Sequence, residues 1–160
     1  METNVLFQVE ISCINFVSII LFISCIFITC HIILSRKKKK PIFETIMEFI
    51  VLIAFFVVMI YTSAGQYLAS RELVNALTSN NCYIVEGAVD NFYTPTVFGH
   101  ESESFTINDV YFEYSNSVDS GYSTTKQFGG CINGNGQLLK ISYITIEERN
   151  IILKIEEKKI

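Results

Sequence analysis

Charged residues are scarce in this chain, and the scarcity is concentrated in its first half. Lys, Arg, Asp and Glu make up 18% of the 160 residues, whereas about a quarter of a typical soluble domain is charged. Apart from its cysteines, Ile11–Leu34 has one ionisable side chain, His31, and Phe49–Tyr61 has no charged side chain. A membrane helix needs about 20 mostly apolar residues. Ile11–Leu34 and Ile42–Ala64 both reach that length, so the sequence predicts two transmembrane helices.

The first ten residues, METNVLFQVE, lack Lys and Arg. A signal peptide places cations before its apolar run and a small-residue cleavage site after it, so a cleaved signal is the weaker interpretation. Five consecutive cations instead follow the first apolar run: Arg36, Lys37, Lys38, Lys39 and Lys40. Short loops rich in Lys and Arg stay in the cytoplasm. We therefore expect this turn to be cytoplasmic and both chain ends to be extracytoplasmic. Contact with anionic lipid is compatible with the turn.

Recognised catalytic and cofactor motifs are also missing. The chain has no HExxH, no CxxC pair and no Gly-rich phosphate loop that ends in Lys-Ser/Thr. The stretch QFGGCINGNG is rich in glycine, but it is better interpreted as a loop that needs left-handed backbone than as a phosphate nest. From Gln66 onward, the chain has seven Lys and Arg residues and twelve Asp and Glu residues. An acidic domain binds nucleic acid poorly, so we expect no catalysis, no cofactor and no nucleic-acid partner.

The second half of the chain has a sequence pattern typical of a β domain. Five segments are rich in β-branched and aromatic residues: CYIVEGAVDNF, ESFTIND, VYFEYS, QLLKISYITI and NIILKIE. Turns are expected at Asn108-Asp109 and in EERN, with a bend at Gly87 and a long loop between the third and fourth segments. Five strands with this spacing predict a small barrel of the oligonucleotide/oligosaccharide-binding (OB) type. A small open meander packed on the preceding helix is the alternative.

This pattern predicts three parts: a transmembrane hairpin over 1–65, a helical stalk over 66–80 and the OB-like barrel over 81–160. The stalk carries an apolar stripe at a spacing of three to four residues, which includes Tyr67, Val74 and Leu77.

The β segments also resemble a widespread, uncharacterised family of small bacterial proteins. The residues that carry the resemblance are VEGAVDNF (Val85–Phe92), Pro95, Gly99-His100, ESFTINDVYFEYS (Glu103–Ser115), Gly121-Tyr122, Phe128–Gly130, Ile141–Tyr143 and IILKIE (Ile151–Glu156). They cover the region from Tyr67 to Glu156. The resemblance implies a compact β domain, often behind membrane helices, and it implies no activity.

A candidate binding surface follows from two loops, 91–103 and 121–130. Its residues are Asn91, Phe92, Phe98, His100, Glu103, Tyr122, Phe128, Gly129 and Gly130. His100 and Glu103 could hold a metal or act as an acid–base pair. A metal site needs three or four ligands, and only Asp109 could be added. A turn capped by His100, with solvated glutamates, is therefore the favoured interpretation of that pair.

The cysteines and the acidic residues of the apolar half have structural interpretations. Cys13, Cys25 and Cys30 are expected to be packing residues. A disulfide between Cys82 and Cys131 is permitted outside the cytoplasm, but an OB-like barrel would place them near opposite ends. Glu44 and Glu48 share a helical face, where pairing with the interfacial lysines is favoured over a proton path.

We therefore predict a membrane-anchored binding module without catalytic activity. It would lie in a bacterial inner membrane with both termini extracytoplasmic, contact the lipid bilayer and bind an envelope protein or a small ligand. The transmembrane helices could also form a homo-oligomer. Two alternatives are an immunity or defence accessory protein at the inner membrane and a metal-dependent enzyme at His100 and Glu103.

Overall fold

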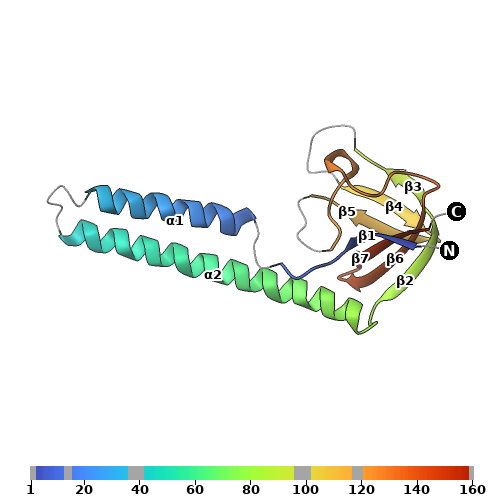
Figure 1. Cartoon of the computed structure of the whole chain (residues 1–160), viewed down its shortest axis with the longest axis horizontal. Helices are drawn as coiled ribbons and strands as arrows, with labels where there is room; N and C mark the ends of the chain where they lie inside the picture. The colour runs from blue at the N-terminus through green and yellow to red at the C-terminus, as the bar shows by residue number, and fades with distance from the viewer. Residues whose placement is uncertain (1–2, 13–15, 36–41, 96–101, 117–120, 159–160) are drawn as a thin grey trace. The chain divides into compact units, whose positions relative to one another are not determined.

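The structure is a computed structural model that describes residues 3–12, 16–35, 42–95, 102–116 and 121–158. Within these residues the chain forms two α-helices, seven β-strands and one 3-10 turn (Figure 1). The elements are β1 (Thr3–Gln8), α1 (Phe16–Ser35), α2 (Ile42–Thr78), β2 (Tyr83–Ala88), β3 (Asp90–Tyr93), β4 (Glu103–Ile107), β5 (Val110–Tyr114), η1 (Lys126–Phe128), β6 (Leu138–Ile146) and β7 (Arg149–Lys158). They divide into a helical unit, residues 12–69, and a β unit, residues 1–11 and 70–160.

The helical unit is an antiparallel pair formed by α1 and the first part of α2. The Ser18 Oγ lies 3.1 Å from the Ser63 Oγ, and the Nδ1 of His31 lies 3.9 Å from an oxygen of Glu48. The start of α1 therefore lies beside a late part of α2, and the end of α1 lies beside an early part of α2. The large apolar side chains of α2 point outward, and Ile46–Thr78 is long and apolar enough to cross a membrane.

The prediction of two transmembrane helices is wrong for the part of the chain that the structure describes. There, α2 is the one helix with the length and composition of a span, whereas the apolar stretch of α1 over Ser18–His31 is shorter. The stretch of α1 whose side chains the structure describes, 18–31, is shorter than the about 20 apolar residues that a span needs at 1.5 Å of rise each. The cations that were expected to set the topology, Arg36–Lys40, lie outside the described residues.

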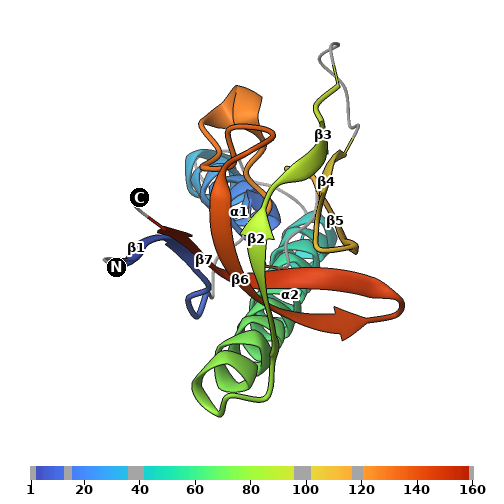
Figure 2. The ribbon, with the colours of Figure 1, turned by 90° about the vertical axis from the view of Figure 1, so that its right-hand side faces the viewer.

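The β unit contains two antiparallel sheets. One has four strands in the order β1-β7-β6-β2, and the other has three in the order β3-β4-β5. Figure 2 shows the chain passing from β2 directly into β3, and so from one sheet into the other. The single strand predicted from Cys82 to Phe92 is therefore two strands. Asn91, next to the break, has a left-handed φ of 52°.

The predicted five-stranded OB-like barrel is also wrong. The described strands form two separate sheets and no closed barrel. Two features that local sequence patterns do not predict explain the difference between the barrel and the two sheets. The N-terminal β1 pairs with β7, from Thr3 opposite Lys158 to Gln8 opposite Lys154, and the β2–β3 break sends the chain to a second sheet.

Both predicted hairpin turns are present. The β4–β5 turn places Asn108 and Asp109 at φ values of 46° and 65°, and the β6–β7 turn places Glu147 and Glu148 at 47° and 65°. Positive φ at both central residues matches the twist of a two-residue hairpin. Asn and Asp adopt this backbone readily, whereas Glu does so at a cost.

The main core of the β unit is built from side chains of both sheets. Its fully buried members include Phe105, Phe112, Leu139 and Ile155. Phe105 and Phe112 stack across the β4–β5 pair with ring centroids 5.1 Å apart. The rings fill this core because apolar side chains of neighbouring strands meet on one face of each sheet.

A second, smaller core lies where the end of α2 meets β7. It contains Val9, Leu73 and Leu153, all buried. The β6–β7 pairing runs from Ser142–Lys154 to Tyr143–Ile152 and skips Leu153, which marks a bulge. At this bulge Leu153 packs against the end of α2, while Ile152 and Ile155 stay in the main core. The last turns of α2 are thus part of the β unit.

Candidate functional site

The carboxylate of Glu103, at the start of β4, is the organising group of the predicted binding surface. Its side chain is fully buried. It accepts hydrogen bonds from the Thr94 Oγ1 at 2.6 Å, the Tyr114 hydroxyl at 2.9 Å and the Lys126 N–H at 2.9 and 3.0 Å. A buried carboxylate is tolerable only where donors replace its lost water. Glu103 therefore fastens together three segments that lie far apart in the sequence.

Tyr114 shows the electrostatic effect of that carboxylate. Burial of the phenol, together with its hydrogen bond to Glu103, raises the pKa of Tyr114 well above its usual value. The phenol therefore stays protonated and acts as a permanent donor to Glu103. This bond links β5 to β4 through side chains in addition to the backbone ladder.

Further contacts hold the two predicted loops against each other. The Gln127 Nε2 donates to the Pro95 carbonyl at 2.9 Å, and the Lys126 Nζ lies 5.7 Å from the centroid of the Phe92 ring. The N–H of Phe92 donates to the Asn135 Oδ1 at 2.7 Å. The structure thus brings the segment after β3 beside η1, as a shared binding surface requires.

The glycines of this surface have structural roles. Gly130 has no room for a side chain, because a Cβ there would lie 2.7 Å from the Tyr122 hydroxyl and even closer to the Thr124 carbonyl. Gly129 ends η1 in the left-handed conformation, with φ at 85° and open space around it. The predicted positive φ in this loop is correct at Gly129.

Tyr122 is a core residue rather than an exposed contact. It is 4% exposed, and its hydroxyl accepts the Cys131 N–H at 2.7 Å. Burial raises the pKa of Tyr122 above its ordinary value and outweighs the Cys131 N–H bond, which lowers it. Cys131 and Cys82 are both free thiols.

Among the described aromatic residues of the predicted set, Phe128 is the exposed one. Its side chain is 64% exposed at the end of η1. Phe92 is partly buried against the main core, and Asn91 donates from its Nδ2 to the Thr106 Oγ1 at 3.1 Å. Phe98 and His100 lie outside the described residues. The surface that remains is an exposed phenylalanine beside Lys126, Gln127 and the edge of Phe92, which we call the η1 face.

Glu103 is poorly suited to the metal site considered for it. Donors from three residues already occupy its oxygens. A carboxylate offers about four acceptor positions, so little capacity is left for a cation. Among the described residues no group of three His, Cys, Asp or Glu side chains is placed to hold a metal ion.

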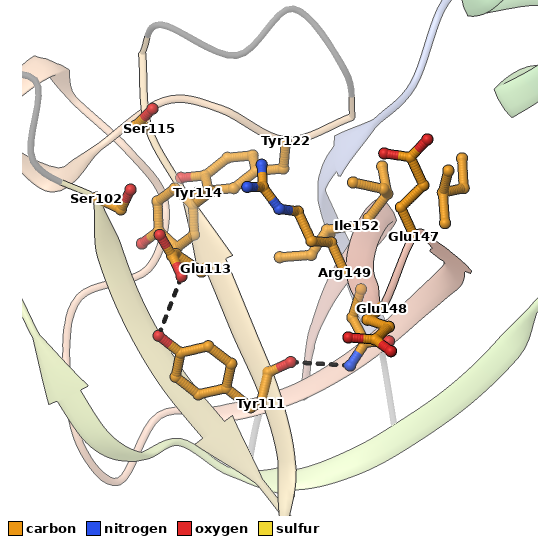
Figure 3. Close-up of a pocket in the computed structure, with 13 residues that line it drawn as sticks. Ser102, Tyr111, Glu113, Tyr114, Ser115, Tyr122, Glu147, Glu148, Arg149 and Ile152 are labelled. Carbon is orange, nitrogen blue, oxygen red and sulfur yellow. Dashed lines mark hydrogen bonds between the residues drawn. The ribbon is translucent and has the colours of Figure 1, made fainter.

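The structure also contains a cavity that sequence patterns did not indicate. Its volume is about 480 Å³, and it lies between β5 and the β6–β7 turn (Figure 3). Tyr114 and Tyr122 contribute buried rings, while Glu113, Arg149 and the turn glutamates contribute charge. The lining comes from residues spread between Ser102 and Ile152, so no local motif could have revealed it.

No family model, no curated protein and no solved structure matches this chain. The resemblance to a family of small bacterial proteins therefore stays a prediction.

Proposed function

We propose that this protein is a membrane-anchored binding module without catalytic activity, which holds an envelope protein or a small ligand on its η1 face. The observation that carries the proposal is the arrangement around Glu103. A buried carboxylate fastens Thr94, Tyr114 and Lys126 together, and Phe128 stands exposed beside them. An exposed aromatic on a rigid support is typical of a binding anchor.

The anchor of this module is the apolar surface of α2. Phe43, Ile53 and Ile60 are each more than 60% exposed, which is favourable in lipid and costly in water. The positive-inside rule supports a cytoplasmic position for Arg36–Lys40, just before α2. The family resemblance supports a bacterial inner membrane.

The pairing of β1 with β7 adds a constraint on sidedness. Strands that exchange backbone hydrogen bonds share one compartment, so residues 3–8 lie on the same side of the membrane as β7. Cysteines introduced at Asn4, in β1, and at Thr145, near the end of β6, should therefore react with an impermeant maleimide from the same side. Both positions are exposed. Labelling of both positions from the same side supports this shared compartment, and labelling of one from outside intact cells but of the other only after lysis contradicts it.

Photo-crosslinking tests the η1 face directly. A benzoyl-phenylalanine in place of Phe128 should give a discrete adduct in living cells. Tyr83 on β2 is the matched control, because it is an aromatic residue with nearly the same exposure, 65% against 64%. Specific adducts at Phe128 and none at Tyr83 support the proposal. Equal adducts at both positions, or none at Phe128, count against this face.

A further inference from the structure

β5 is an edge strand, and one of its backbone carbonyls accepts a hydrogen bond from outside its sheet. The sheet order β3-β4-β5 leaves β5 at the edge. The Asn150 Nδ2, on β7, donates to the Tyr111 carbonyl at 2.9 Å. Figure 3 shows this bond at the cavity beside β5. A side-chain amide thus occupies the place that the N–H of a neighbouring strand would take.

The same edge continues from Tyr111 along the cavity. Alternate residues of a strand direct their backbone N–H and C=O to the same side, so Glu113 shares the outward direction of Tyr111. Both residues line the cavity. Among the described residues, no other backbone group bonds to them from outside the β4–β5 pair. An open edge of this kind is a template for an added strand.

The opposite wall of the cavity is the β6–β7 turn, and the charge around the cavity is predominantly negative. Glu113, Glu147 and Glu148 contribute three carboxylates, and Arg149 contributes one guanidinium. No ion pair involves these four side chains within the described part of the chain. The cavity therefore combines an open strand edge, space beside it and a surplus of unpaired negative charge.

We propose that this cavity binds an extended peptide segment rich in Lys or Arg. The segment adds to the outer edge of β5 through backbone hydrogen bonds, and its cationic side chains lie against Glu113, Glu147 and Glu148. Strand addition supplies affinity through the main chain, while alternate side-chain contacts supply selectivity. This site is distinct from the η1 face in its residues and its chemistry, so it goes beyond the binding function proposed above.

Fluorescence anisotropy with the full chain in a non-ionic detergent tests the proposal. The probe is a fluorescein-labelled Lys-Val-Lys-Val-Lys peptide at low salt, and Glu-Val-Glu-Val-Glu is its charge-reversed counterpart. We expect saturable binding of the lysine peptide and none of the glutamate peptide. The triple variant E113Q/E147Q/E148Q should weaken binding by at least about fivefold, since exposed ion pairs contribute modestly one by one.

Two controls separate the proposed site from general attraction to an acidic protein. The triple variant E72Q/D90N/D109N changes the net charge equally at exposed positions that do not line the cavity, and it should bind the lysine peptide as the native protein does. A lysine peptide methylated on alternate backbone nitrogens keeps its charge but loses main-chain donors, and it should bind at least about tenfold more weakly.

Three results would overturn the proposal. Equal loss in the two triple variants would reduce the binding to net charge. Full binding of the N-methylated peptide would exclude strand addition on β5. Absence of saturable binding by the lysine peptide to native protein, with its circular dichroism intact, would remove the site altogether.

Discussion

The two units of this protein use the same residue type in opposite ways. In the helical unit Phe43 is 73% exposed, and in the β unit Phe105 and Phe112 have no exposed surface. Burial of a phenylalanine side chain from water stabilises a fold by about 1.5–3 kcal/mol. In the β unit that contribution comes from other side chains. In the helical unit the apolar surface of α2 is left uncovered by the described residues, so none of them supplies that contribution.

This difference teaches that apolar content alone does not indicate what a segment packs against. The middle of α2, residues 49–60, is apolar on all sides, whereas a β strand such as Val110–Tyr114 alternates between buried and more exposed positions. The alternating pattern fits a solvent-covered domain with an internal core.

The largest effect is expected from a comparison of two phenylalanines. Phe112→Ala should lower the free energy of unfolding of the β unit by about 3–5 kcal/mol, because it opens a cavity in a close-packed core. Phe56→Ala on the outer surface of α2 should leave that free energy unchanged. Urea unfolding in detergent, followed by circular dichroism, measures both. Similar losses for the two variants would show that the two units do not differ in this way.

The second prediction concerns the buried carboxylate. Glu103→Ala should destabilise the β unit by about 3 kcal/mol, since it leaves buried donors on Thr94, Tyr114 and Lys126 without their acceptor. Glu113→Ala, at an exposed position ten residues further on, should stay within about 0.5 kcal/mol of the native protein. Chemical denaturation of the two variants tests the difference. A small effect at Glu103 would contradict its role as the group that fastens the η1 face.

Two neighbouring glycines offer a matched pair with a smaller effect. Gly130→Ala should cost about 1–3 kcal/mol, because the added Cβ overlaps the Tyr122 hydroxyl and the Thr124 carbonyl. Gly129→Ala has open space and meets only the cost of a left-handed backbone, about 1 kcal/mol. The melting temperature of each variant provides the comparison. A reversed order would show that the backbone of this loop differs from the one described.

The smallest effect concerns Glu156 on β7 and depends on pH. Burial opposes ionisation of Glu156, but the hydrogen bond from Lys154 and the charges of Lys154 and Lys140 outweigh it, so the pKa of Glu156 is lowered from 4.5. A lowered pKa stabilises the folded state above about pH 4.5, and this contribution is lost as the pH falls through the lower folded value.

We expect that contribution to be below about 1 kcal/mol, because the lysine partners are partly exposed. Denaturation midpoints between pH 7 and pH 3 for the native protein and Glu156→Gln measure it. The native protein should lose more stability than the variant over this interval. Parallel pH profiles would show that the ion pairs around Glu156 contribute nothing.

Local sequence patterns predicted much of the secondary structure correctly. The β4–β5 hairpin follows from alternation on both sides of Asn108-Asp109, and the β6–β7 hairpin follows from two apolar runs around Glu147-Glu148. The proximity of the two loops of the predicted binding surface follows from the sequence, but the roles of individual residues in it do not. Tyr122 and Glu103 are buried and structural, since burial depends on neighbours from other strands that no local pattern specifies.

By itself, the sequence determined where the chain is apolar enough for lipid, where it turns and which short segments become strands, because these properties depend on composition and on neighbouring residues. Only the tertiary structure decided that β1 joins β7, that β2 and β3 belong to different sheets and that a cavity borders β5. Those features depend on hydrogen bonds and contacts between residues far apart in the chain. Their formation is settled by the competition among all possible strand pairings rather than by the propensity of any one segment.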